Sequence, residues 1–302
     1  MAKLPAKRVI LSLSIVAIIL AICIISVTTA FSVNHGWHDL LLRYFGATEE
    51  QIESLSTLTG YPATTLRQDD ITITVNQTII DSYGIYVLYE IVLPDSIKLR
   101  KDTDVVVRST VVPTNSSDDD NTFGISTTKV LEQSGNRITV LQHDSSTTPI
   151  IDGTVTLYVL GINYVVQDSD PSRIETLLHG RWSLKWEHNS PSDTNINYEA
   201  NIPISINGSE NTITRIVITP VSISIFINGD DILRSAHPIV SFVDGSHIDY
   251  DMETPNSSFT YFLSDESDMI YTNQLYYRFE SIISIDNIES ITIGDVTIRN
   301  NA

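Results

Sequence analysis

The sequence predicts an all-β fold of two antiparallel β-sandwiches, preceded by one transmembrane helix and a short amphipathic helical neck. Three observations lead to this prediction. An uncharged apolar run lies near the start, apolar residues alternate with polar ones through most of the remainder, and polar turns separate short strand-like segments. Alternation with a period of two indicates half-buried strands. Because no helical segments intervene between these strands, antiparallel sandwiches are favoured over α/β units.

The composition limits the classes of protein to which the chain can belong. Of its 302 residues, 42% are hydrophobic and 18% are charged, so a packed core is expected rather than wholesale disorder. The net charge is −19 and no stripe of basic residues occurs along the chain, so we expect no nucleic acid partner. The single cysteine, Cys23, excludes an intramolecular disulfide and any site with several thiolate ligands.

Residues 9–31 contain no charged residue, and a helix of that length would measure about 34 Å against a bilayer core of about 30 Å. Lys3, Lys7 and Arg8 precede the run, which predicts a cytoplasmic tail at residues 1–8 and extracellular C-terminal domains. An uncleaved signal anchor is the favoured interpretation of this segment. A cleaved signal peptide ending near Thr28–Ala30 and a lipoprotein signal at Cys23 are the alternatives.

A helical neck is expected over residues 36–60. Aromatic and leucine side chains recur there on one helix face, Thr48 opens a T-E-E-Q capping box, and Gly60 with Pro62 would stop the helix. The aromatic side chains Trp37 and Tyr44 would either anchor the neck beside the membrane or pack against the first exported domain. His35 and His38 have no acidic or thiol partner nearby in the sequence, so we assign them no metal.

The first sandwich domain is expected over residues 66–200 and the second over residues 201–302. Trp182, Leu184 and Trp186 alternate, which predicts that they face the core together. Each stretch has the length and strand pattern of an immunoglobulin-like domain. The candidate strands of the first are 71–75, 85–91, 104–112, 137–143, 153–166 and 181–188. Those of the second are 202–206, 212–219, 221–228, 238–243, 258–263, 275–283 and 290–298.

Three segments carry a resemblance to a known family. The neck WHDLLLRYFGATEEQIESL is followed by DDITITVNQTIIDSYGIYVLYEIVLP and, later, by GRWSLKWEH. Together they resemble the exported region of transmembrane anti-sigma factors of Gram-positive bacteria, a region known as domain of unknown function 4179. The resemblance implies a strand pair with an Asp at its turn, here Asp81, and a closing strand that opens with Gly180-Arg181-Trp182. The later segment ITRIVITPVSISIFI resembles the start of the immunoglobulin-like domain that often follows.

One departure from this family affects the expected function. Those anti-sigma factors hold their sigma factor with some tens of cytoplasmic residues before the span, whereas here only Met1–Arg8 precede it. We therefore do not carry the regulatory activity over to this chain.

No catalytic motif is present in the sequence. It lacks H-E-x-x-H, G-x-S-x-G, a phosphate loop and G-x-G-x-x-G. We predict no catalytic, cofactor-binding or metal-ligating residues and no cofactor. Acidic clusters occur at residues 118–120, 230–231, 249–253 and 265–268. We expect these clusters to lie in solvated turns, and the alternative is a weak calcium site. The N-x-S/T sequons occur at the frequency that chance predicts.

These features together predict a non-enzymatic, membrane-anchored extracytoplasmic protein that senses or binds other proteins. Its expected partners are the membrane, through residues 9–31, and other membrane or surface proteins. The alternative is a cation- or ligand-binding surface protein that uses its acidic loops. A third possibility, an extracellular hydrolase with a carboxylate pair, has no motif to support it.

Overall fold

The computed structural model describes residues 44–45, 51, 55, 58–100, 103–114, 123–166, 173–189, 195–206, 208–229, 237–250, 257–259, 272–279 and 281–300. The chain divides into two compact units, Met1–Tyr44 and Phe45–Ala302, and the second contains all described residues except Tyr44. The expected tail 1–8 and span 9–31 lie outside the described residues. No helix among the described residues is long and apolar enough to cross a membrane.

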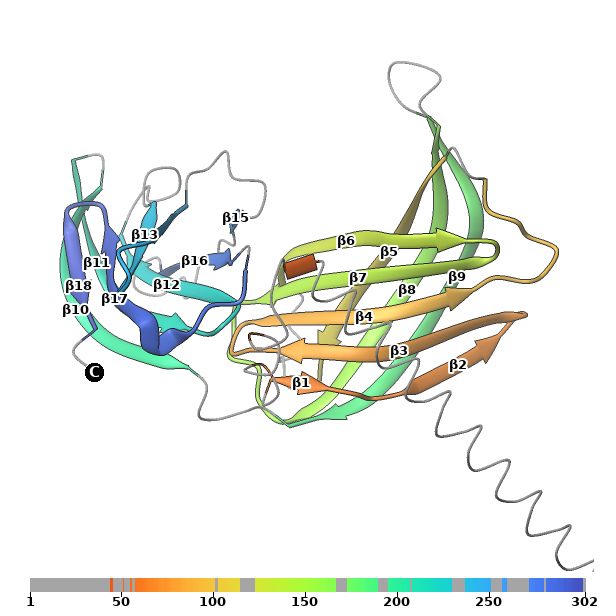
Figure 1. Cartoon of the computed structure of the whole chain (residues 1–302), viewed down its shortest axis with the longest axis horizontal. Coiled ribbons are helices and arrows are strands. Elements are labelled where there is room, and N and C mark those ends of the chain that lie inside the picture. The colour runs from red at the N-terminus through yellow and green to blue at the C-terminus, as the bar shows by residue number, and fades with distance from the viewer. Residues whose placement is uncertain are drawn as a thin grey trace, which may run out of the picture. The chain divides into compact units, whose positions relative to one another are not determined.

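The described part is all-β, and its strands form antiparallel sheets (Figure 1). A six-stranded sheet has the order β1-β3-β4-β7-β6, with β2 also paired to β3. Its strands are β1 (Thr59–Gly60), β2 (Thr64–Gln68), β3 (Ile71–Ile80), β4 (Gly84–Val92), β6 (Phe123–Ser134) and β7 (Arg137–Ser146). A three-stranded sheet has the order β5-β8-β9. Its strands are β5 (Asp104–Pro113), β8 (Gly153–Val166) and β9 (Arg173–His188).

These two sheets enclose one hydrophobic core, and we call β1–β9 the first sandwich. Alternate side chains of each strand point into the core, as in β3, where Ile71, Ile73 and Val75 are buried between half-buried neighbours. Trp182 and Trp186 of β9 are buried in this core, which confirms the predicted inward face of that strand. The alternation follows from the pleat of a strand, because successive side chains point to opposite faces of the sheet.

Two further sheets enclose a second core, and we call β10–β18 the second sandwich. One sheet has the order β10-β11-β12-β16-β15 and the other β14-β13-β17-β18. The strands of the first are β10 (Ile196–Ile206), β11 (Ser209–Ile218), β12 (Ser222–Asn228), β15 (Ser257–Phe259) and β16 (Thr272–Arg278). Those of the second are β13 (Pro238–Phe242), β14 (His247–Asp249), β17 (Ile288–Ile293) and β18 (Val296–Arg299). Isoleucines dominate this core, with Tyr250, Tyr277 and Phe279 beside them.

The structure corrects several expected boundaries. The neck was expected to stay helical to residue 60, but Thr59 and Gly60 form β1 and pair with Ile79 and Thr78. Residues 290–298 were expected to form one strand, but β17 and β18 are two strands joined by a turn at Gly294 and Asp295. Strands β2, β6 and β14 were not expected at all. Of the expected strand 258–263, residues 260–263 lie outside the described part.

Candidate functional site

The acidic and histidine residues give no metal centre within the described part of the chain. No group of three or more His, Cys, Asp or Glu side chains is placed there to hold an ion. The acidic runs 118–120, 230–231 and 265–268 lie outside the described residues, and of the run 249–253 only Asp249 and Tyr250 are described. His35 and His38 also lie outside them. The other five histidines are spread over both sandwiches, at 143, 179, 188, 237 and 247.

Asp81 is buried where the turn between β3 and β4 meets the turn between β11 and β12. The residue as a whole is 1% exposed. Oδ1 accepts hydrogen bonds from the backbone N–H groups of Tyr83 (2.8 Å) and Gly84 (2.5 Å). Oδ2 accepts from the hydroxyls of Ser222 (2.6 Å) and Thr219 (3.1 Å) in the second sandwich. Burial raises the pKa of Asp81, although these four donors act in the opposite direction.

A buried aromatic group lies beside this carboxylate. The His143 ring of β7 stacks on Tyr86 of β4, with ring centroids 4.2 Å apart and planes at 14°. His143 Nε2 lies 3.2 Å from the hydroxyl of Tyr276 on β16. Burial lowers the pKa of His143 to about 3, so the imidazole is neutral at physiological pH. These contacts and those of Asp81 form what we call the junction. Its aromatic and carboxylate groups are enclosed, so they hold the two sandwiches together and are closed to a substrate.

Asp144 is the second buried carboxyl group, and it lies inside the first sandwich. Its Oδ2 accepts hydrogen bonds from the backbone N–H of Val111 on β5 (2.7 Å) and from Gln142 Nε2 (2.9 Å). The hydroxyls of Ser109 and Thr128 donate to Gln142 Oε1. These side chains form a polar cluster between β5, β6 and β7, next to the hydrophobic core. Burial raises the pKa of Asp144 to about 7. Asp144 therefore links an edge strand of one sheet to the other sheet.

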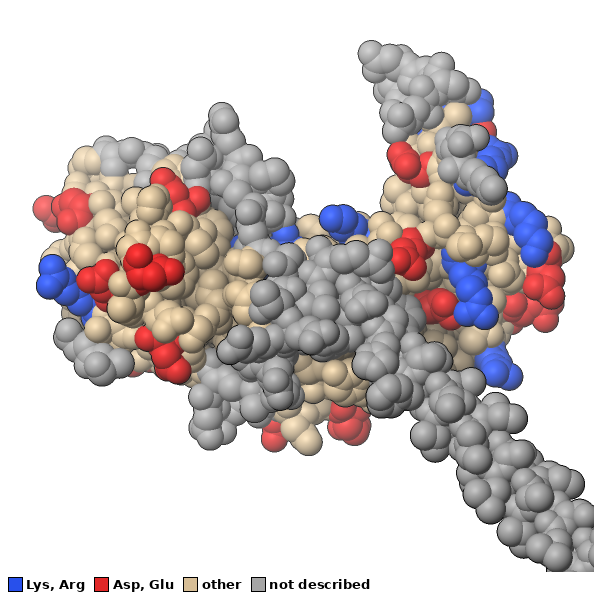
Figure 2. Space-filling model, viewed as in Figure 1, with Lys and Arg blue, Asp and Glu red and all other residues tan. Residues whose placement is uncertain are grey.

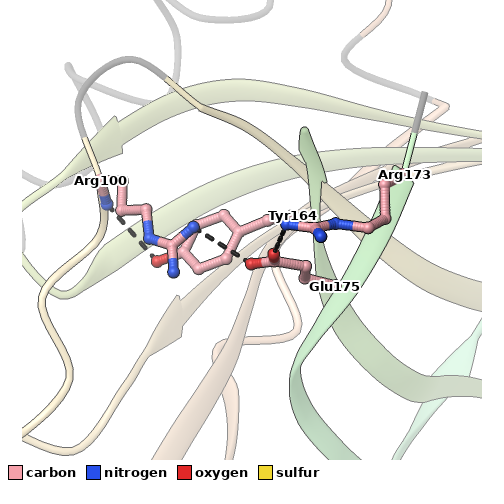
Figure 3. A network of polar contacts seen from close by, with 4 residues as sticks. All are labelled: Arg100, Tyr164, Arg173 and Glu175. Atoms are coloured by element: carbon pink, nitrogen blue, oxygen red, sulfur yellow. Dashed lines mark hydrogen bonds and ion pairs between the residues drawn. The ribbon is translucent and has the colours of Figure 1, made fainter. Parts of the chain in front are cut away.

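A surface network occupies the opposite end of β5, β8 and β9 (Figure 3). Arg100 and Arg173 both form ion pairs with Glu175, at 3.1 Å for Arg100. The Arg100 guanidinium also lies 4.9 Å from the ring centroid of Tyr164. Both arginine side chains are more than half exposed, so each pair contributes little to stability. The network orders the start of β9, and we assign it no ligand.

The outer face of the three-stranded sheet carries cations that are not neutralised by described residues. On β9, the side chains that alternate with the buried tryptophans point outward, and they include exposed Arg181 and Lys185. Arg108 is exposed on the same face of β5. Half-buried Tyr158 of β8 lies between them, opposite Ser183, and the Arg181 guanidinium stacks 4.9 Å from its ring centroid. We call Arg108, Tyr158, Arg181 and Lys185 the cationic face.

None of the three cations of this face forms an ion pair with a residue that the structure describes, whereas Arg100, Arg137 and Arg173 do. Glu187 lies at one end of the face and is hydrogen-bonded to Thr154. In the view of Figure 2, most visible Lys and Arg side chains lie on the first sandwich, and acidic side chains prevail on the second. The cationic face therefore stands out locally against a strongly acidic chain.

Sequence reasoning did not find the cationic face. Its members come from three strands that are distant in the sequence. They meet because β5 and β9 both pair with β8, in registers that shift at three irregularities. The outward alternation of Arg181, Ser183 and Lys185 was visible, since the residues that alternate with them were expected in the core, namely Trp182, Leu184 and Trp186. The position of Arg108 beside them depends on long-range pairing, which no local pattern contains.

The described surface includes a cavity on each sandwich. The larger, about 790 Å³, is lined by Gln51, by apolar residues such as Phe242, Ile282 and Ile283, and by polar residues that include Asp244 and His247. Gln51 Nε2 donates to the Ile282 carbonyl at 3.1 Å, which fixes one wall. The smaller, about 350 Å³, lies between β1 and the end of β9 near Trp186. Glu187 and His188 are among the residues that line the smaller cavity.

Comparisons with known proteins bear on the fold only. No family model and no curated protein matches the chain. A similar solved structure is described as the crystal structure of the conserved domain protein from Bacillus anthracis. It matches with a TM-score of 0.51 and 12% identity, over 79% of this chain and 77% of that one. At this identity the likeness shows a shared all-β architecture and carries no activity over to this chain.

Proposed function

We propose that the chain is a non-enzymatic interaction module that residues 9–31 anchor in the cell membrane with its β-sandwiches outside. The observation that carries this proposal is the contrast between its polar sites. The carboxyl groups of Asp81 and Asp144 and the imidazole of His143, whose pKa values burial shifts, are enclosed in the protein. Arg108, Arg181 and Lys185, which form no ion pair with a described residue, lie on an exposed sheet face. Catalytic groups need contact with substrate, whereas a charged, aromatic surface suits a partner protein.

The proposal includes a kinship with the exported region of anti-sigma factors and immunoglobulin-like topology for both sandwiches. Asp81 supports this kinship, because it lies in a turn between paired strands as the resemblance implies. Gly180 supports it too. A Cβ atom there would lie 2.5 Å from the Trp182 ring, so the Gly-x-Trp spacing has a steric reason in this chain.

The membrane part of the proposal is tested with the full-length chain, tagged at its C-terminus and expressed in a Gram-positive host. We expect the chain in the membrane fraction and the tag to be digested by protease added to intact cells. A matched control carries Ile18→Asp and Ile19→Arg, because each charge at the centre of a span opposes insertion by about 3 kcal/mol. Recovery of the unmodified chain in the cytosol, with its tag protected, would contradict the anchor.

The interaction part is tested by chemical crosslinking in the same cells. We expect the wild type to capture the same membrane or surface protein in replicate experiments. As a control, this protein should no longer be captured when the sample is denatured with detergent before crosslinking. Absence of any specific crosslinked protein across replicate cultures would count against an interaction role.

A further inference from the structure

We propose that the cationic face is the docking surface for a short acidic segment of a partner protein. This inference rests on the proposed interaction role and names the chemistry of the partner. Its basis is charge complementarity on an exposed sheet face, supported by an aromatic side chain at the centre.

The face has the layout of a small recognition patch. Arg181 and Lys185 are four residues apart on β9, a separation of about 13 Å, and β5 lies two strands away at about 10 Å. Tyr158 lies between the cations, and the directly paired positions Ser183 and Thr110 add hydroxyl groups beside it. Tyrosine and arginine are among the residues that most often supply binding energy in protein interfaces. A segment with two or three carboxylates could contact all three cations at once.

The charge of the whole chain decides which kind of anion fits. At physiological ionic strength the Debye length is about 8 Å, so a short acidic segment experiences mainly the local cations. A long polyanion would extend beyond the patch onto a chain that carries 37 acidic and 18 basic residues. Residues 196–302, which include the second sandwich, have 15 acidic and 4 basic residues and would repel it. Glu187, at the edge of the patch, would also repel a polyanion that extended past the three cations. These charges favour a compact acidic protein segment over a wall polymer or an anionic membrane.

The test uses the full-length chain in detergent and a fluorescein-labelled hexaglutamate peptide as the probe. We expect binding at about 50 mM salt that weakens at about 300 mM, because screening shortens the reach of surface charges. The triple variant Arg108→Gln, Arg181→Gln, Lys185→Gln should weaken binding by about tenfold or more, as expected for three lost surface contacts. The matched control Arg67→Gln, Lys98→Gln, Arg299→Gln changes the net charge equally, replaces exposed residues elsewhere, and should bind like the wild type.

Two competitors separate the partner classes. Long-chain polyphosphate and phosphatidylglycerol vesicles should compete poorly with the peptide. The proposal is overturned if the wild type does not bind the peptide, if both triple variants lose binding equally, or if either competitor binds the face more tightly than the peptide. These outcomes are independent of the fractionation and crosslinking experiments above. A negative result here would therefore leave the proposed interaction role standing. A negative crosslinking result would likewise leave the binding of the acidic peptide to this face standing.

Discussion

Asp144 is the single residue with the clearest expected effect on stability. Its folded pKa of about 7 exceeds the ordinary aspartate value, so the folded state prefers the protonated form. The contribution of this protonated group to the free energy of unfolding is fully present below about pH 4 and is lost as the pH rises through 7. Asp144→Asn cannot ionise. Relative to the wild type, it should gain about 2 to 4 kcal/mol in free energy of unfolding between pH 5 and pH 8.

Urea unfolding of both proteins at pH 5, 6, 7 and 8 measures this difference. Asp244 is exposed in the turn after β13 and accepts hydrogen bonds from Ser246, which lower its pKa. Asp244→Asn is therefore the control. Its free energy of unfolding should change with pH in the same way as that of the wild type over this range. If the Asp144→Asn profile also runs parallel, the buried carboxyl group does not titrate near neutrality.

At the scale of elements, the β17–β18 hairpin depends on one glycine. Gly294 has φ of +57°, a conformation that side chains with a Cβ atom rarely adopt, and it is the first residue of a two-residue turn. Gly294→Ala should therefore lower the free energy of unfolding by about 1 kcal/mol. Gly153→Ala, at the start of β8, has ordinary φ and open space for a methyl group, so it should change little. Thermal unfolding of the two variants compares them directly, and equal melting temperatures would contradict the role of this turn.

The elements also show how much of the fold the sequence could predict. Strands with one buried face, such as β3, β8 and β12, were expected because isoleucine and valine alternate with polar residues there. The edge strand β6 was not expected, because FGISTTKVLEQS has few apolar residues to mark an inner face. The β17–β18 turn was missed although Gly294-Asp295 marks it, because apolar residues occur on both sides of it. The cationic face required the pairing of three strands and so could not be predicted from local patterns.

At the scale of the whole molecule, the junction should make the two sandwiches unfold together. Asp81→Ala leaves two backbone N–H groups and two hydroxyls of the junction without their acceptor, at a cost of about 1 to 3 kcal/mol for each buried unsatisfied group. We expect one calorimetric transition for the wild type and two for this variant. Asp81→Asn keeps an acceptor oxygen and should show an intermediate loss.

Gly84→Ala tests the same junction through sterics, because its Cβ atom would collide with the Tyr276 hydroxyl oxygen. Gly84→Ala should give two calorimetric unfolding transitions, as Asp81→Ala does. The control Asp244→Ala, which lies in an exposed turn, should give one. A wild type that already unfolds in two steps would show that the junction does not couple the sandwiches.

The neighbouring positions of His143 and Asp144 on β7 have a consequence for proton exchange. Their side chains point to opposite faces of the strand, one into the junction and the other into the core. From about pH 4 to 6.5, the unfolded chain carries a proton on the histidine, whereas the folded chain carries one on the aspartate. For these two groups, folding thus relocates a proton by one residue and takes up none from solvent. His143 and Asp144 together therefore contribute no net change of stability with pH over that range.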